Sequence, residues 1–242
     1  MTVKLTGEMR SSYVGRNYPT NWQLFVDTKP TAGELRRLRV TEARADFFRW
    51  AAAYRYAKSF LGATFAAAGK IGPDTKALYD CGLRNLLTYS CFEQFCSRVL
   101  LVKMDEDKDL KQLQDPYGQA AIIDRIRTLD PGYKFFGFLH DNLDDPKLKA
   151  RLKHFIAGTQ CNVSFIGKVT RHAFAHGRLA ASSGVQVLSP GVTEITEKEK
   201  ILELVHAFLL KRMDDEFQRR VINRLPVRRE PVPSPPNSDT PF

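Results

Sequence analysis

Helix-forming sequence dominates this chain and most limits the folds open to it. Residues 31–68 are rich in alanine, leucine, arginine and glutamate, follow a candidate cap at Thr31 and close on a glycine. Apolar side chains recur at helical spacing in residues 74–103, 147–175 and 197–221. The sequence shows no alternation of strands and helices. We therefore predict an all-α fold, a helical bundle of four or five main helices.

The ends of the chain differ from its middle. Residues 1–30 mix glycine, proline and isolated aromatics without a sustained period, which predicts an irregular N-terminal arm. We expect three of its side chains to pack on the bundle: Trp22, Leu24 and Phe25. Residues 31–222 form the helical domain in this interpretation. Residues 223–242 are rich in proline and poor in apolar side chains, so we expect a flexible or disordered tail.

Shorter segments complete this picture. Residues 116–130 read as a short helix opened by a proline, and residues 131–146 read as an aromatic turn region. Residues 147–175 can form one long helix, with a kink near Gly158. Residues 184–192, GVQVLSPGV, indicate a small hairpin or an extended loop.

Composition narrows the class of protein. The formal net charge is +10, which favours polyanionic partners such as nucleic acid. No apolar run approaches the roughly 18 residues that span a bilayer, and the N-terminus lacks the apolar stretch of a signal peptide, so we expect a soluble, cytoplasmic protein with no membrane partner. The cysteines show no paired metal-ligand spacing and are expected to be buried thiols: Cys81, Cys91, Cys96 and Cys161.

The segment RHAFAHG, residues 171–177, concentrates polar chemistry at an expected helix end. Arg171 keeps its charge at physiological pH, and its planar fork suits a phosphate or a carboxylate. His176 can give or take a proton. Cleavage of RNA can use the substrate's own 2′-hydroxyl as nucleophile, so a base, an acid and a cation suffice, with no metal or cofactor. Gly177 is placed to end the helix in a left-handed conformation.

Helix geometry constrains how this segment can act. At about 100° per residue, Arg171 and His176 lie about 140° apart, whereas His172 and His176 share a face. Two copies meeting across a two-fold axis could bring both sets into one cleft, or the last turn of the helix could unwind at Gly177. We expect a homodimer. Glu93 lies on an apolar stripe of residues 74–103. Either it faces a cation such as Arg171, or it sits at the edge of the stripe and reaches solvent.

A metal site is the chemical alternative for the two histidines. His172 and His176 have the i, i+4 spacing of the histidine pair in a zinc helix, but no glutamate lies between them to act as base. A third ligand would come from His140, His154 or Glu93. His206 lies among apolar neighbours in residues 197–221 and is expected to be a structural histidine.

The motif resembles the signature of the HEPN domain superfamily, an arginine and a polar residue followed, after three more positions, by a histidine. Arg171, His172 and His176 match those positions, and a helical segment carrying Glu93 precedes the motif. The resemblance implies a dimeric helical bundle that pairs two motifs in one cleft and cleaves RNA without metal, leaving 2′,3′-cyclic phosphate ends. It further implies Glu93 as an orienting residue. Arg178 departs from the subgroup paired with nucleotidyltransferases, which has a tyrosine there.

Proteins of this kind often act as toxins or as effectors of antiphage defence. The resemblance therefore implies an endoribonuclease acting on single-stranded RNA or transfer RNA, restrained by a regulatory or antitoxin partner. The alternative is a non-catalytic module of the same fold that binds RNA or a protein. Replacement of His176 separates these hypotheses, because binding should survive it and cleavage should not.

Overall fold

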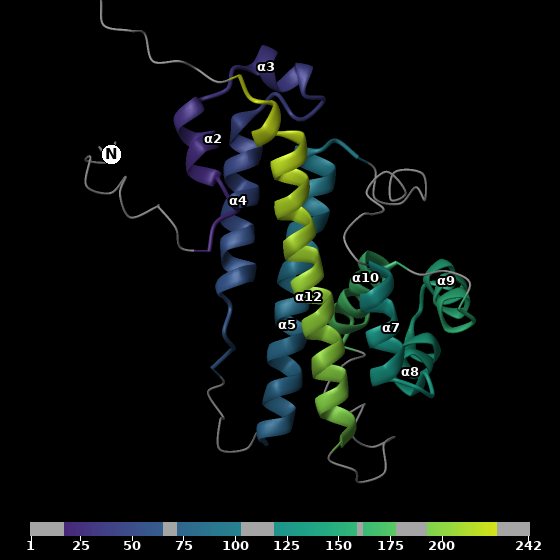
Figure 1. Cartoon of the computed structure of the whole chain (residues 1–242). Helices are drawn as coiled ribbons and strands as arrows, with labels where there is room; N and C mark the ends of the chain where they lie inside the picture. The colour runs from purple at the N-terminus through teal and green to yellow at the C-terminus, as the bar shows by residue number, and fades with distance from the viewer. Residues whose placement is uncertain (1–16, 65–71, 103–118, 159–161, 178–192, 227–242) are drawn as a thin grey trace, which may run out of the picture.

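The computed structural model describes residues 17–64, 72–102, 119–158, 162–177 and 193–226 (Figure 1). Every regular element in these segments is a helix, and none is a strand, which confirms the all-α class. The elements are α2 (Trp22–Thr28), α3 (Ala32–Arg37), α4 (Arg44–Ser59), α5 (Pro73–Gln94), the π-helix η2 (Phe95–Val99), α7 (Gln119–Leu129), α8 (Lys134–Asn142), α9 (Pro146–Ile156), α10 (Val163–Ala175), α12 (Thr193–Arg220) and the 3-10 helix η3 (Ile222–Arg224).

The two longest helices, α5 and α12, form the centre of the bundle (Figure 1). They run parallel, because Thr88 contacts His206 and, further along both helices, Cys91 contacts Met213. Helix α4 packs on one side of this pair, and α7 to α10 lie on the other (Figure 1). Parallel neighbours need a long crossover connection, and the chain between α5 and α12, which includes α7 to α10, supplies it.

The N-terminal segment contributes to the core and is not irregular throughout, as the sequence had suggested. Residues 22–28 form α2, and the side chains of Trp22 and Phe25 are buried in the same core as the bundle helices. The Trp22 ring lies 6.0 Å from that of Phe217 on α12. The expectation for Leu24 was wrong, since half of this residue is exposed. Aromatic packing against α12 therefore organises this segment despite its poor helical pattern.

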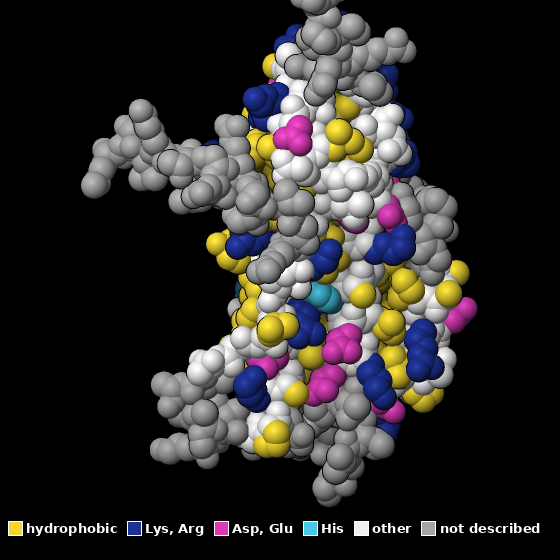
Figure 2. Space-filling view, turned by 60° about the vertical axis from the view of Figure 1, so that its left-hand side comes forward, with side chains coloured by type: hydrophobic (Ala, Val, Ile, Leu, Met, Phe, Trp, Pro, Cys, Tyr) yellow, Lys and Arg dark blue, Asp and Glu magenta, His cyan; other side chains and the backbone are white. Residues whose placement is uncertain are grey.

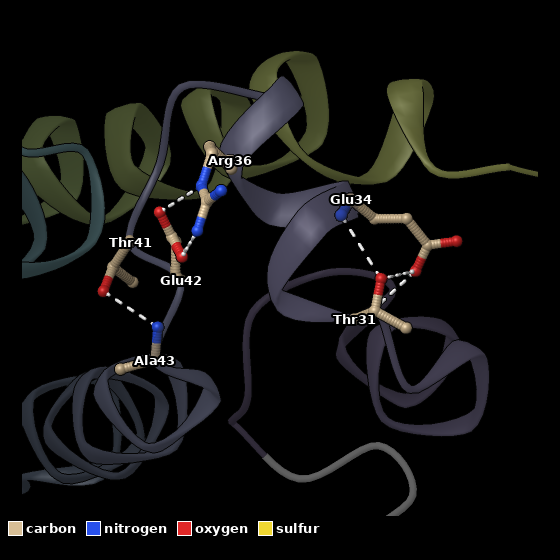
Figure 3. Close-up of polar contacts among 6 residues, drawn as sticks. All are labelled: Thr31, Glu34, Arg36, Thr41, Glu42 and Ala43. Atoms are coloured by element: carbon tan, nitrogen blue, oxygen red, sulfur yellow. Dashed lines mark hydrogen bonds and ion pairs between the residues drawn. The ribbon is translucent and has the colours of Figure 1, made fainter.

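Helix α3 begins where the sequence predicted a threonine cap. The Thr31 hydroxyl accepts a hydrogen bond from the backbone N–H of Glu34, and the Glu34 carboxylate accepts from the backbone N–H of Thr31 (Figure 3). This reciprocal pair is a capping box, which satisfies two otherwise unpaired backbone donors. Arg36 near the end of the helix donates two hydrogen bonds of 2.6 Å to Glu42 (Figure 3).

The single helix predicted over residues 31–68 is wrong, because the chain turns between α3 and α4. Arg39 has a left-handed backbone with φ of 59°, and Val40 is buried. The backbone N–H of Thr41 donates to the carbonyl of Val99 at 2.9 Å, which ties the turn to η2. The Thr41 hydroxyl then accepts from the N–H of Ala43, the residue directly before α4 (Figure 3). Tertiary anchoring of this turn thus outweighs the helix propensity of the surrounding sequence.

The aromatic turn region predicted over residues 131–146 is wrong in its centre, where α8 forms. Asp130 starts this helix, since its carboxylate accepts from the backbone N–H groups of Lys134, Phe135 and Phe136 at 2.9 to 3.3 Å. Three apolar side chains of α8 are buried: Phe135, Phe136 and Leu139. The aromatic residues therefore form the inner face of a short amphipathic helix.

The long helix predicted over residues 147–175 is two helices, so the expected kink is a complete break. Helix α9 starts at Asp145, whose carboxylate accepts from two backbone N–H groups, and the chain leaves it through Gly158 with φ of 75°. Helix α10 has its own cap, because the Asn162 side chain accepts from the backbone N–H of Ser164 at 2.9 Å. Two caps and a left-handed glycine divide the segment.

The remaining predictions on local structure have mixed outcomes. Cys81, Cys91 and Cys96 are buried free thiols, as predicted, and burial raises the pKa of Cys81 to about 11. Cys161, the hairpin predicted at residues 184–192 and the tail beyond residue 226 lie outside the described residues. No helix in the described segments has the length and apolarity required to cross a bilayer.

Candidate functional site

The RHAFAHG motif occupies the last turns of α10 and the residues that end it. Most of α10 is buried, including Val163, Ile166, Val169 and Ala173. The backbone N–H of His176 donates to the carbonyl of His172, and Gly177 follows with φ of 68°. The prediction that Gly177 ends the helix in a left-handed conformation is confirmed. His176 therefore lies at the exposed end of a helix whose remainder is anchored in the core.

Helix α10 packs antiparallel against α5, which fixes the position of the motif. A Cβ atom at Gly167 would lie 3.0 Å from the ring of Tyr89, and one at Gly82 would lie 2.4 Å from the ring of Phe174. Residues later in α10 thus contact residues earlier in α5. The absence of a side chain at Gly82 makes room for Phe174 of the motif, so the end of α10 sits directly on α5.

Glu93 and Arg171 form the contact that the sequence suggested. The Nη2 atom of Arg171 lies 3.8 Å from Oε2 of Glu93, and the two side chains are 36% and 43% exposed. Both expectations for Glu93 therefore hold, since it faces Arg171 and also reaches solvent. At this distance the pair is an ion pair without a close hydrogen bond, and its exposure limits its contribution to stability to below about 1 kcal/mol.

One donor of the Arg171 guanidinium is unpaired in the part of the chain that the structure describes. Its Nε atom is buried and has no hydrogen-bond partner among the described residues. Glu93 lies one turn beyond Tyr89 on α5, and Tyr89 lies opposite Gly167, so the Arg171 side chain runs back toward the N-terminal end of α10. His176 lies at the other end. Within one chain, the guanidinium and the His176 imidazole therefore point toward different ends of α10, which agrees with their angular separation on the helix.

The two motif histidines lie side by side. Their ring centroids are 4.3 Å apart and the ring planes are inclined by 44°. Burial, together with the nearby charges of His176 and Arg171, lowers the pKa of His172 below its usual value, although Asp145 opposes this shift. His172 is therefore neutral at pH 7 and able to accept a proton, while His176 is exposed to solvent.

Two carboxylates near His172 were not identified from the sequence. Asp144 and Asp145 precede α9, and both interact electrostatically with the His172 ring. Backbone hydrogen bonds from Leu148 and Lys147 lower the pKa of Asp145, so this carboxylate is charged at neutral pH. The sequence signal was an aspartate directly before Pro146, a typical start of a helix, but nothing in the sequence placed that start beside α10.

The described residues do not assemble the alternative metal site. They contain no group of three or more histidine, cysteine, aspartate or glutamate side chains placed to hold a metal ion. Glu93 faces Arg171, and His140 pairs with Asp141 at 3.0 Å. None of the proposed third ligands, including His154, therefore joins His172 and His176 in such a group.

His206 is a satisfied structural histidine, as predicted. Its Nδ1 atom lies 2.6 Å from the Thr88 hydroxyl oxygen, and that hydroxyl donates its single proton to the carbonyl of Arg84. Oγ1 therefore accepts from Nδ1–H, which fixes the neutral tautomer. Burial, with a smaller contribution from the Arg84 charge, lowers the pKa of His206 to about 4.

Comparisons of the chain with protein-family models, with curated proteins and with solved structures find no match.

Proposed function

We propose that this protein is a metal-independent endoribonuclease of the HEPN type. The observation that carries the proposal is the placement of Arg171, His172 and His176 at the partly exposed end of one anchored helix. Glu93 beside Arg171 adds the orienting carboxylate that the family resemblance implies. The net charge of +10 further favours a polyanionic substrate.

The chemistry needs only groups that the motif contains. A neutral imidazole removes the proton of the ribose 2′-hydroxyl, and the oxygen attacks the adjacent phosphorus. The bond from phosphorus to the 5′-oxygen breaks, and an imidazolium protonates that oxygen. The products are a 2′,3′-cyclic phosphate and a free 5′-hydroxyl. Arg171 would stabilise the negative charge of the transition state, since its fork matches phosphate oxygens.

A composite site in a homodimer would solve the separation within one chain. Arg171 extends toward Glu93, whereas His176 lies at the end of α10. Across a two-fold axis, the guanidinium of one copy can approach the imidazole of the other. Each copy would then contribute both a cation and a proton-transfer group to one cleft.

The biological role that follows is a toxin or an antiphage defence effector acting in the cytoplasm. Single-stranded RNA and transfer RNA are the proposed substrates, because their unpaired regions allow the 2′-oxygen to reach the in-line geometry. An unrestrained ribonuclease harms its host, so a regulatory or antitoxin protein is the expected partner. Glu93, Arg171 and the motif histidines would carry the activity in this proposal.

The first test is RNA cleavage in EDTA. Purified protein is incubated with labelled single-stranded RNA and with transfer RNA, beside His176→Ala and the control His140→Ala, which removes a histidine outside the motif. We expect cleavage by the parent and by His140→Ala, cyclic phosphate ends on the products, and at least a 100-fold loss in His176→Ala. Equal cleavage by His176→Ala would contradict the proposed role of this residue.

The composite site has its own test. Arg171→Ala and His176→Ala, each inactive alone, are mixed after subunit exchange. In a mixed dimer, one cleft contains the intact guanidinium of one copy and the intact imidazole of the other, so activity should return in part. Two different affinity tags on the two variants allow mixed dimers to be purified in sequence, and no recovery of activity in those mixed dimers would place the site within one chain.

A non-catalytic module is the second candidate function. The separation of Arg171 from His176 within one chain favours it, because a binding surface does not need these groups to converge. In that case RNA or a protein partner binds equally well to the parent and to His176→Ala, and neither cleaves RNA. The cleavage assay thus separates the two candidates.

A further inference from the structure

The outer face of α4 carries an exposed aromatic ring, Tyr56, and a second ring, Phe48, at the edge of the core. The inner face of this helix is buried through Phe47, Trp50, Ala51, Tyr54 and Ala57. Tyr56 and Phe48 point outward and are 67% and 42% exposed. The Phe48 ring packs edge-on against the Trp22 ring, with centroids 5.3 Å apart. The Tyr56 ring is the more exposed and forgoes the stabilisation that burial gives, which makes it a candidate for contact with another molecule.

Cationic side chains alternate with these rings. Arg49 and Tyr56 are seven residues apart, as are Phe48 and Arg55, so each pair lies within about 20° on the helix, about 10 Å apart along its axis. Figure 2, which brings the side of the molecule with α2 and α4 forward, shows lysine and arginine side chains interspersed with hydrophobic ones. The outer face of α4 is thus a two-row pattern of rings and cations.

Several of these cations already lie against aromatic rings. The Arg44 guanidinium is 5.7 Å from the centre of the Phe48 ring, and Lys58 Nζ is 5.5 Å from that of Tyr54. Such contacts hold the long side chains beside the rings. The Phe48 ring is therefore already in contact with a cation, and the ring beside Lys58 is buried, which leaves Tyr56 as the ring of α4 that is open to a base.

The charge of α4 favours a polyanion. The helix contains four cations, Arg44, Arg49, Arg55 and Lys58, and a single carboxylate, Asp46, which pairs with Arg49 at 3.0 Å. Tyr56, the most exposed ring, has no carboxylate on the neighbouring turns of this helix. Charge alone would attract any acidic surface, but exposed planar rings beside cations are the combination that binds unpaired bases and their phosphates together.

We infer that the outer face of α4 is a docking surface for single-stranded RNA, with Tyr56 stacking on a base and Arg49, in the same row of the helix, contacting a phosphate. The inference rests on the proposed function only in that RNA is the ligand. It assigns the substrate a second contact region, away from the motif on α10, that holds unpaired segments and thereby favours them over duplex RNA.

The test measures binding without cleavage. The full chain carrying His176→Ala is titrated in EDTA into a labelled single-stranded RNA of mixed sequence, with fluorescence anisotropy as readout. Tyr56→Ala removes the exposed ring, and Tyr56→Phe keeps it. Arg49→Gln removes a cation from the surface, and Arg125→Gln is its matched control on α7, where the arginine is also exposed. Circular dichroism verifies that all variants are folded.

We expect Tyr56→Ala to weaken binding about tenfold and Tyr56→Phe to bind like its parent, because stacking depends on the ring. Arg49→Gln should reduce the salt dependence of log K by about 0.7, the value for one phosphate contact on a single strand, and Arg125→Gln should not. Unchanged affinity in folded Tyr56→Ala would overturn the inference. Equal affinity of the His176→Ala protein for single-stranded and duplex RNA would also overturn it. Displacement of the RNA by polyglutamate of equal charge at equal concentration would overturn it too, and would indicate an acidic protein as the partner.

The result is separable from that of the proposed function. Loss of binding in Tyr56→Ala supports the docking surface even where the protein with an intact His176 cleaves no RNA. Conversely, if cleavage requires His176 but RNA affinity is unchanged in Tyr56→Ala, the ribonuclease is supported and the docking surface is overturned.

Discussion

The neutral His206 ring makes the stability of the bundle depend on pH in a way that can be calculated. This side chain lies between α12 and α5, where its Nδ1–H donates to the Thr88 hydroxyl. Burial and, to a smaller extent, the Arg84 guanidinium lower its pKa from 6.5 to about 4. Glu203 lies 3.7 Å from Arg84 and partly balances this charge. Protonation would therefore place a second positive charge beside Arg84 in the helix interface.

The sign follows from proton binding. Below pH 6.5 the unfolded chain binds a proton at residue 206, while the folded chain does not bind one until the pH approaches 4. Stability is thus fully present above pH 6.5 and is lost as the pH falls toward 4. Each pH unit in that window costs about 1.4 kcal/mol, so between pH 7 and pH 5 this residue removes about 2 kcal/mol from the free energy of unfolding.

Urea unfolding at pH 7, 6 and 5 measures this loss, with His206→Asn as the comparison. Asparagine keeps a side-chain N–H for Thr88 but does not titrate in this range. Other groups titrate alike in both proteins, so the difference between their losses reports residue 206. The parent should lose about 2 kcal/mol more than the variant from pH 7 to pH 5. Equal losses would refute the claim that the folded bundle keeps His206 neutral.

Three further predictions test the fold around the site. Trp22→Ala should lower the free energy of unfolding by about 3–5 kcal/mol in urea titrations, because the ring is buried in the core; a change below about 1 kcal/mol would mean that the N-terminal segment is a separate arm. Gly177→Ala should cost about 1–2 kcal/mol in the same assay through its left-handed backbone, and stability equal to the parent's would contradict that conformation. Asp145→Ala should lower the thermal midpoint by removing the cap of α9, at a cost of about 1 kcal/mol, whereas Asp141→Ala, outside any cap, should change it little.

Periodicity predicted the helical class and the long helices, and local rules predicted several of their ends. The cap at Thr31 and the left-handed Gly177 lie where the sequence placed them. The contact between Glu93 and Arg171 was also foreseen, because a carboxylate on an apolar stripe requires a cation or solvent. The two helix ends depend on residues that are neighbours in the sequence, and the contact of Glu93 depends on one strong electrostatic requirement. Both kinds of information can be read from a single sequence.

The errors arose where distant contacts decide local structure. The turn before α4 is held by a hydrogen bond from Thr41 to Val99, far along the chain, and the short α2 is held by aromatic packing of Trp22 on α12. The proximity of Asp145 to His172 depends on how α9 meets α10. The sequence contained a weak local signal in each case: a threonine, a tryptophan and an aspartate before proline. The partner that each of these residues contacts is set only when the helices pack together.

The arrangement of the motif also constrains any account of its activity. A helix directs its side chains toward its own N-terminus, so Arg171 reaches Glu93 on α5, whereas His176 stands at the end of α10 where the helix stops. Moving Arg171 to the His176 end of α10 would break the ion pair with Glu93, which costs less than about 1 kcal/mol because the pair is exposed. The pair can therefore open for a phosphate at little cost. In the proposed ribonuclease, Glu93 would hold Arg171 until a phosphate takes its place. Glu93→Gln should leave the fold intact and tighten RNA binding, measured by fluorescence anisotropy, because the guanidinium no longer has a competing carboxylate.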